Sequence, residues 1–213
     1  MNLSPRQHDM LAIAAALADE LAPRVDANDR AGRFPIENYA DLHRSGYLRQ
    51  IVPTEYGGAG ANLFETVLMQ ERLAQGDGAT AMAANMTMHL IGRVREVGNY
   101  PTPVFEAICR DVAENGALIN GAASEPELGS PSRGGLPATS ATPTAGGWLI
   151  NGHKQFVTMA PALRYFVTSV ALPPSPDAPQ GATANAIVRA PVEGLRLEDP
   201  WGGALGLRTS GSY

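Results

Sequence analysis

Two polar segments in the second half of the chain hold the residue types that could bind a flat or anionic ligand. The first is 121–130 (GAASEPELGS) and the second is 151–158 (NGHKQFVT). Small residues at 121–124, followed by glycine and serine at 129 and 130, would leave backbone N–H groups open to a polarised carbonyl or a phosphate. The same residues would equally suit two ordinary turns between strands, so the residues alone leave both interpretations open.

The other candidates for chemistry lack the spacing that a site requires. The four histidines are scattered and form no HxxxH or CxxC pattern, so no metal site is expected. No GxSxG nucleophile elbow is present, and the glycine-rich stretch 56–60 lacks the Lys-Ser or Lys-Thr of a phosphate loop. The single cysteine, Cys109, lies among apolar positions of a predicted helix and is interpreted as a small core residue.

Composition and charge exclude several classes of protein. The 213 residues are 44% hydrophobic and carry a formal net charge of −5. That charge argues against nucleic acid as a partner, because duplex binding needs a positive field. No window approaches the ~20 consecutive apolar residues of a membrane span, so no membrane is expected. One cysteine cannot form an internal disulfide and the N-terminus has no secretory pattern, so the predicted location is cytoplasmic.

The elements that must position the two segments change character near Gly116. Residues 1–116 hold 6 Pro and 10 Gly, whereas 117–213 hold 11 Pro and 13 Gly, a shift typical of a domain boundary. In the first part apolar residues recur at spacings of three and four, which indicates helices. They are predicted over residues 5–27, 35–44, 63–75, 79–97 and 101–115. Residues 1–116 are therefore predicted to form an all-α N-terminal domain.

Residues 117–213 alternate short apolar runs with clusters of glycine, proline and asparagine, a pattern that predicts strands. The expected strands are 117–123, 136–143, 147–151, 154–158, 165–172 and 183–189. Short strands at this spacing favour an antiparallel β-barrel or sandwich-like domain over βαβ units. The predicted fold class is therefore α+β, with a helical domain at 1–116 and an antiparallel β-domain at 117–213.

The two polar segments also match a family pattern. The order small-small-[Ser/Thr]-Glu-Pro-x-x-Gly-Ser, followed by Asn-Gly-x-Lys-x-aromatic-[Val/Ile]-Thr, resembles the flavin-binding middle domain of the acyl-CoA dehydrogenases. Residues 46–60, 83–91 and 206–212 resemble further stretches of that family in the same order. The resemblance covers nearly all of the chain and implies the family's helical N-terminal domain followed by its middle β-domain.

The resemblance implies FAD-dependent α,β-dehydrogenation of an acyl-CoA thioester, in which a glutamate removes the α-proton and the β-hydride passes to flavin N5. Ser124 takes the place of the family's Thr that hydrogen-bonds the pyrimidine side of the flavin, and Thr158 lies beside N5. Phe156 replaces a Trp that packs against the flavin. The cofactor-binding residues implied in this way are Gly121, Ala122, Ala123, Ser124, Gly129, Ser130, Phe156, Val157 and Thr158.

Substrate contacts are implied by the same resemblance. Ser130 would lie near the flavin phosphate and the acyl-CoA chain, and Met86 and His89 lie on the helix beside the acyl pocket. Plain core packing is the alternative for Met86 and His89. Pro131 stands where the family usually has Asp, so the resemblance leaves the pocket shape and the identity of the acyl group open.

Members of the family continue beyond the Ser-Gly-Ser turn with a helical bundle that carries the glutamate base and builds the oligomer. This chain is expected to be truncated before that bundle, to hold no catalytic residue of its own and to be inactive alone. The whole protein is expected to use an electron-transfer partner and to form a homo-oligomer. Two alternatives stay open: a flavin-dependent monooxygenase on the same fold, and a non-catalytic binding or assembly module.

Overall fold

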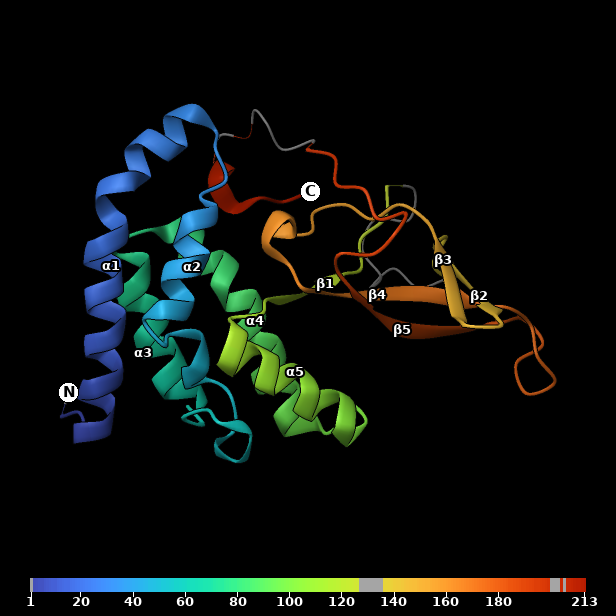
Figure 1. The fold of residues 1–213 in the computed structure, drawn as a ribbon, viewed down its shortest axis with the longest axis horizontal. Coiled ribbons are helices and arrows are strands. Elements are labelled where there is room, and N and C mark those ends of the chain that lie inside the picture. The colour runs from blue at the N-terminus through green and yellow to red at the C-terminus, as the bar shows by residue number, and fades with distance from the viewer. Residues whose placement is uncertain (1, 127–135, 200–203, 205) are drawn as a thin grey trace. The chain divides into compact units, whose positions relative to one another are not determined.

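A computed structural model describes residues 2–126, 136–199, 204 and 206–213 of the chain. Within these residues the helices come first and the strands follow (Figure 1). The helices are α1 (Pro5–Ala31), α2 (Ile36–Arg44), α3 (Leu63–Ala74), α4 (Gly78–Val97) and α5 (Thr102–Asn115). The strands are β1 (Ile119–Ala122), β2 (Ser140–Thr144), β3 (Gly147–Asn151), β4 (Tyr165–Leu172) and β5 (Ala182–Arg189).

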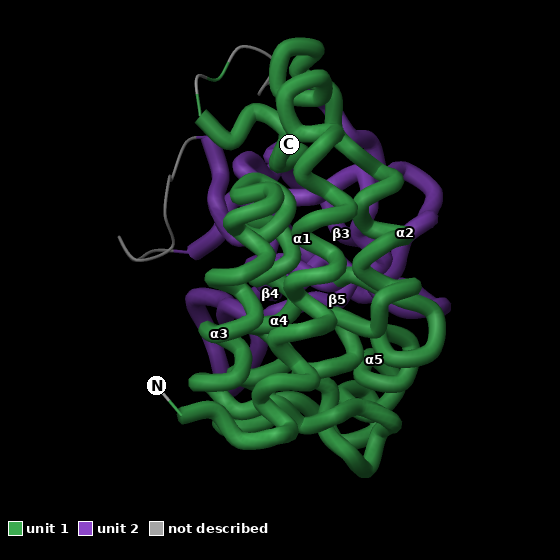
Figure 2. The backbone as a smooth tube through the Cα atoms, turned by 90° about the vertical axis from the view of Figure 1, so that its left-hand side faces the viewer, with its two compact units in different colours: residues 1–118, 201–211 green, residues 119–200, 212–213 purple. Residues whose placement is uncertain are grey.

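The chain divides into two compact units, which Figure 2 colours separately. The helical unit holds residues 1–118 with 201–211, and the sheet unit holds residues 119–200 with 212–213. The domain limits 1–116 and 117–213, taken from composition, stay a prediction. In the part of the chain that the structure describes, no helix combines the length and the apolar character that a membrane crossing requires.

Local signals account for the ends of the helices. α1 begins after Ser4, whose hydroxyl accepts a hydrogen bond from the Gln7 amide in a capping box, and Asn62 caps α3 in the same way. α1 runs four residues beyond its predicted end because Gly32 supplies the left-handed conformation that closes a helix. The other predicted helices are found within one residue of their expected ends.

The helical unit packs α1 on α3 and α3 on α4. Leu17 and Leu21 of α1 and Leu73 of α3 belong to its fully buried core. Gly76, between α3 and α4, approaches α1 so closely that a Cβ atom there would lie 2.3 Å from the carbonyl oxygen of Ala18. Only glycine therefore allows the chain to turn at this position without displacing α1.

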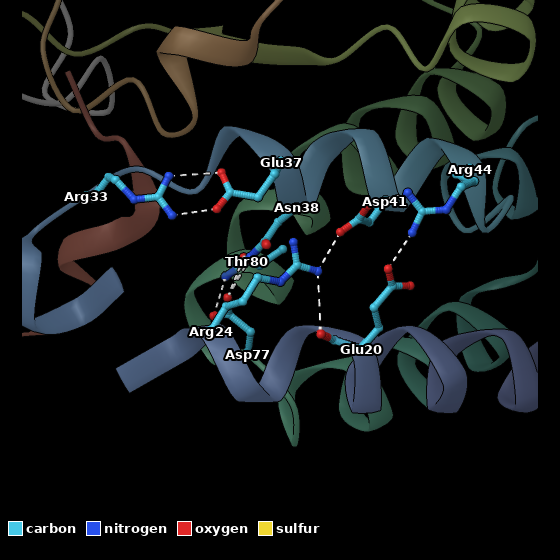
Figure 3. Close-up of polar contacts among 9 residues, drawn as sticks. All are labelled: Glu20, Arg24, Arg33, Glu37, Asn38, Asp41, Arg44, Asp77 and Thr80. Atoms are coloured by element: carbon cyan, nitrogen blue, oxygen red, sulfur yellow. Dashed lines mark hydrogen bonds and ion pairs between the residues drawn. The ribbon is translucent and has the colours of Figure 1, made fainter. Parts of the chain in front are cut away.

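Polar side chains join α2 to α1 and to the start of α4 (Figure 3). Asp41 of α2 accepts a hydrogen bond from Arg24 of α1 at 2.5 Å. Asn38 of α2 donates from Nδ2 to Asp77 at 3.1 Å and to Thr80 at 2.9 Å. Asn38, Asp41, Asp77 and Thr80 are all buried, so these directional contacts help to specify how the three helices dock.

β4 is the strand on which the sheet is assembled. It pairs in parallel with β1 and antiparallel with β5, where Tyr165 lies opposite Arg189 and Leu172 opposite Ala182. β2 meets β4 at one parallel bridge and forms an antiparallel hairpin with β3. The α+β class is confirmed, but the described sheet is mixed and open rather than wholly antiparallel. The reason is that β1 and β4 are neighbours in the sheet and run in the same direction.

The segment 154–158, predicted as a strand, is a loop that leads into a short 3₁₀ turn at Ala160–Ala162. Phe156 and Met159 both have positive φ angles, of 60° and 56°. Extended pairing cannot continue through left-handed backbone at two positions so close together. The prediction of a strand there was therefore wrong.

Candidate functional site

Hydrogen bonds bring the two polar segments of the sequence together in the sheet unit. β1 ends at Ala122, and the Ser124 carbonyl that follows it accepts a hydrogen bond from the Gln155 amide at 3.0 Å. Asn120 in β1 donates from Nδ2 to the Thr158 carbonyl at 3.0 Å. The residues around the end of β1 therefore lie side by side with the loop that follows β3.

Residues 212–213 join the same arrangement. The Thr158 hydroxyl lies 3.2 Å from the Ser212 hydroxyl. The Val157 amide donates to the Tyr213 carbonyl at 2.7 Å, and the Tyr213 amide donates to the Val157 carbonyl at 3.3 Å. The end of the 206–212 stretch thus meets the loop through both side-chain and backbone contacts.

A buried ion pair, which sequence reasoning missed, adjoins these contacts. Lys154 Nζ lies 2.7 Å from Glu125 Oε1, and only 11% and 4% of the two side chains are exposed. Burial alone would raise the pKa of Glu125, but hydrogen bonds from Lys154 and Thr139 lower it to about 2. The Glu125 carboxylate is therefore ionised at neutral pH. In the sequence the ion pair could be seen only as an acidic residue in one polar segment and a basic residue in the other.

Gly152 explains part of the second segment's pattern. A Cβ atom at this position would lie 2.3 Å from the Thr139 Oγ1 and 2.6 Å from the Thr139 Cα. The chain therefore needs glycine where it passes Thr139. Because the Thr139 hydroxyl donates to Glu125 Oε1 at 2.6 Å, a Cβ atom at position 152 would strike a member of the ion-pair network.

The residues predicted to contact a cofactor differ in exposure. Ala122 and Val157 are buried, Ala123, Ser124 and Thr158 are half-buried, and Gly121 and Phe156 are exposed. Phe156 leaves 56% of its surface open at a φ of 60°. A left-handed backbone costs about 1–3 kcal/mol at a residue other than glycine, and such strain gathers at binding sites. Phe156 is therefore an exposed ring on strained backbone.

Two hydroxyl groups near the end of β1 make no hydrogen bond within the described residues. Among the described residues the half-buried Ser124 hydroxyl makes no hydrogen bond. Thr168 lies opposite Ala122 in the β1–β4 register. Its buried Oγ1 also has no hydrogen-bond partner among the described residues. Neutral hydrogen-bond donors, small residues and an exposed ring suit a flat ring system with polar edges. The charges of Glu125 and Lys154 compensate each other, so the pair adds no net charge.

The remaining predicted residues lie elsewhere or outside the description. Gly129 and Ser130 lie outside the described residues. Met86 and His89 are on α4 in the helical unit, where Met86 is half-buried and His89 is exposed. Cys109 is fully buried, and this burial raises the pKa of its thiol to about 12. Within the described ranges no group of His, Cys, Asp and Glu side chains could hold a metal ion.

A groove of about 400 Å³ in the sheet unit is distinct from these contacts. It is mostly apolar and is lined by residues 160–164, 166, 190–192, 195 and 197. Of the residues predicted to bind cofactor or substrate, none that the structure describes lines it. The position of the groove therefore does not support a role for it in the site formed by the two polar segments.

Residues 5–100 match the family model described as the acyl-CoA dehydrogenase N-terminal domain. A putative acyl-CoA dehydrogenase, YdbM of Bacillus subtilis (strain 168), is 35% identical over 197 residues, covering 92% of this chain and 50% of the relative. The amino sugar nitrososynthase RubN8 of Streptomyces rubradiris is 34% identical over 211 residues, covering 92% and 46%. The chain spans about half the length of the curated relatives it matches.

A solved structure agrees with these matches. KijD3 in complex with FMN and dTDP-3-amino-2,3,6-trideoxy-4-keto-3-methyl-D-glucose superposes with a TM-score of 0.84 at 25% identity. The match covers 99% of this chain and 51% of that chain. The relatives of this chain thus include a protein named as an acyl-CoA dehydrogenase and one named as an amino sugar nitrososynthase. The domain match, the named relatives and the order of the motifs agree that the chain belongs to the acyl-CoA dehydrogenase family.

Proposed function

We propose that this chain is the flavin-binding part of an FAD-dependent oxidoreductase that dehydrogenates an acyl-CoA thioester between its α and β carbons. One observation carries the proposal: the segments that resemble the family's flavin-binding motifs lie together, joined by the Gln155–Ser124 and Asn120–Thr158 hydrogen bonds. A cytoplasmic location belongs to the same proposal. Because the chain spans half the length of its relatives, the activity is proposed for the whole protein.

The proposed roles of the residues follow from their chemistry. A bound flavin supplies a hydride acceptor at N5 and gains negative charge at its pyrimidine edge on reduction. The Ser124 hydroxyl and the backbone of Ala122 and Ala123 would donate to that edge and favour the charge. The Thr158 hydroxyl, held by Ser212, would orient the N5 side. The other proposed cofactor contacts are Gly121, Gly129, Ser130, Phe156 and Val157.

The substrate and the partners are proposed on the family resemblance. Ser130, Met86 and His89 are the proposed contacts of the acyl-CoA, and reduced flavin would pass its electrons to an electron-transfer partner. No carboxylate of this chain is proposed as the base that removes the α-proton. The complete protein is proposed to be a homo-oligomer.

A flavin-dependent monooxygenase is the second candidate. It is favoured by the RubN8 nitrososynthase, which is nearly as similar to this chain as YdbM is. Reduced flavin activates dioxygen in such chemistry, so no glutamate base is needed. The same Ser124 and Thr158 contacts would serve either reaction, because both depend on holding the flavin edge in place.

Flavin titration tests the binding proposal. FAD and FMN are added separately to the whole protein, freed of bound flavin, while quenching of flavin fluorescence is followed. Thr158→Val should weaken binding, whereas Thr142→Val, which alters an exposed threonine of β2, should not. Equal binding by both variants would contradict the proposed contact, and no binding of either flavin by the wild type would overturn the flavin site.

Substrate tests separate the two reactions in the whole protein. Flavin bleaching on anaerobic addition of saturated acyl-CoA thioesters would support dehydrogenation. If acyl-CoA leaves the flavin oxidised and the chemically reduced enzyme instead oxygenates an amine, the dehydrogenase proposal fails and the monooxygenase replaces it.

A further inference from the structure

Lys154 is held by three hydrogen bonds that use all three protons of its ammonium group. Its Nζ donates to Glu125 Oε1 at 2.7 Å, to the Ser169 carbonyl at 2.8 Å and to the Ser169 hydroxyl at 3.2 Å. Lys154 follows β3, Glu125 follows β1 and Ser169 lies in β4. One side chain therefore ties together three parts of the sheet unit.

Glu125 is satisfied just as fully. Besides Lys154, its carboxylate accepts hydrogen bonds from the Ala138 amide at 2.7 Å, the Thr139 amide at 3.0 Å and the Thr139 hydroxyl at 2.6 Å. These donors come from the residues just before β2. The network thus reaches a fourth segment, and the two charges at its centre are almost completely removed from water.

Stability alone is a weak reason to keep such a pair. Taking two charges out of water is costly, and buried ion pairs are often replaced by apolar residues with little loss of stability. A pair that fixes geometry is a better explanation here, because each partner adjoins a proposed flavin contact. Glu125 directly follows Ser124, and Lys154 lies two residues before Phe156.

The backbone carries the constraint from the ion pair to the proposed contacts. Gln155, which follows Lys154, donates its amide to the Ser124 carbonyl and its side-chain Nε2 to the Glu125 carbonyl at 3.2 Å. The strained Phe156 comes next. Loss of the ion pair would therefore free the two segments to separate and the loop to relax its strain.

We infer that Glu125 and Lys154 are positioning residues that hold Ser124 and the Phe156–Thr158 loop at the separation a flavin requires, before the flavin binds. The inference rests on the proposed function. Neither residue touches the flavin in this account. They raise affinity because the site is already ordered and less entropy is lost on binding.

The decisive variant is Glu125→Gln/Lys154→Met, which removes both charges together and leaves no buried charge unpaired. A purely structural pair would lose nothing but stability. A positioning pair predicts at least a tenfold weaker affinity for FAD at a temperature where circular dichroism shows the variant folded. It also predicts faster hydrogen exchange at the Gln155 and Val157 amides without flavin. Wild-type affinity in the folded variant would overturn the inference.

A second variant decides the question if the double variant does not fold. Glu125→Asp keeps the charge but shortens the side chain by one methylene, so the carboxylate cannot reach all its donors at once. Weaker FAD binding with intact secondary structure supports positioning, and unchanged binding refutes it. The matched control is Glu106→Gln/Arg110→Met, which removes an exposed pair on α5 and should leave affinity unchanged.

The wild type separates this inference from the proposed function. If the wild-type whole protein binds neither FAD nor FMN, the proposed flavin site fails and the positioning role fails with it. If the wild type binds FAD and the double variant binds it equally tightly, the flavin site stands and only the positioning role is refuted.

Discussion

Lowering the pH should remove the stabilisation that Glu125 contributes to the sheet unit. Burial opposes its ionisation, but the hydrogen bonds from Lys154, Thr139 and Ala138 bring the pKa from 4.5 to about 2. At about 1.4 kcal/mol per pH unit, this lowering corresponds to about 3 kcal/mol of stability. Because the folded-state pKa is the lower one, the contribution is complete above about pH 5 and is lost as the pH falls from 4.5 towards 2.

The assay is urea unfolding of the wild type and of Glu125→Gln/Lys154→Met between pH 7 and pH 3. Apart from Glu125 and Lys154 the two proteins carry the same titrating groups, so the difference between their free energies of unfolding reports on this pair alone. From pH 5 to pH 3 the wild type should lose about 2 kcal/mol more than the double variant. Tryptophan fluorescence can follow the transition, because Trp148 lies on β3 in the sheet unit.

Two results would refute this reasoning. Stability curves that stay parallel down to pH 3 would mean that Glu125 has the same pKa in the folded and unfolded states. A wild-type curve that gains stability relative to the variant in acid would mean that its pKa is raised by folding. The dependence of the free energy on urea concentration must stay the same for both proteins, since a changed slope signals a loss of two-state behaviour.

Three further predictions concern single positions. Gly76→Ala should lower the free energy of unfolding by about 1–3 kcal/mol in urea, because the new Cβ would strike Ala18, whereas Gly78→Ala, with open space, should leave it equal or higher. Asn62→Ala should cost about 0.5–2 kcal/mol in the same assay by removing the cap of α3, and no loss would contradict the capping box. In the whole protein, Thr158→Val should slow flavin reduction more than it weakens flavin retention; unchanged rapid-mixing kinetics would exclude a role beside N5.

The helical half could be predicted closely because its signals are local. A cap such as Asn62 and a closing glycine such as Gly32 act on residues within one turn of themselves. The loop 154–158 could not be predicted, since its composition resembles a strand. Phe156 in this loop and Met159 just after it both have positive φ, although neither is of a type that favours it. Tertiary contacts hold them there against their own preference.

The candidate site divides in the same way. The two polar segments and the family they resemble were readable from motif order alone. The Glu125–Lys154 pair was not selected, because an acid and a base 29 residues apart are ordinary surface residues until a fold buries them together. The parallel pairing of β1 with β4 was missed for a related reason, since alternation of residue types does not state strand direction.

By itself, the sequence determined the helices, the two polar segments and the family that they resemble, because caps, periodicity and motif order belong to neighbouring residues. Only the tertiary structure decided that Lys154 meets Glu125 and Ser169, and that Thr158 meets Ser212, 54 residues away. Contacts over such separations depend on which strands pair and in which direction. That choice is set by the packing of the whole unit, so no local pattern contains it.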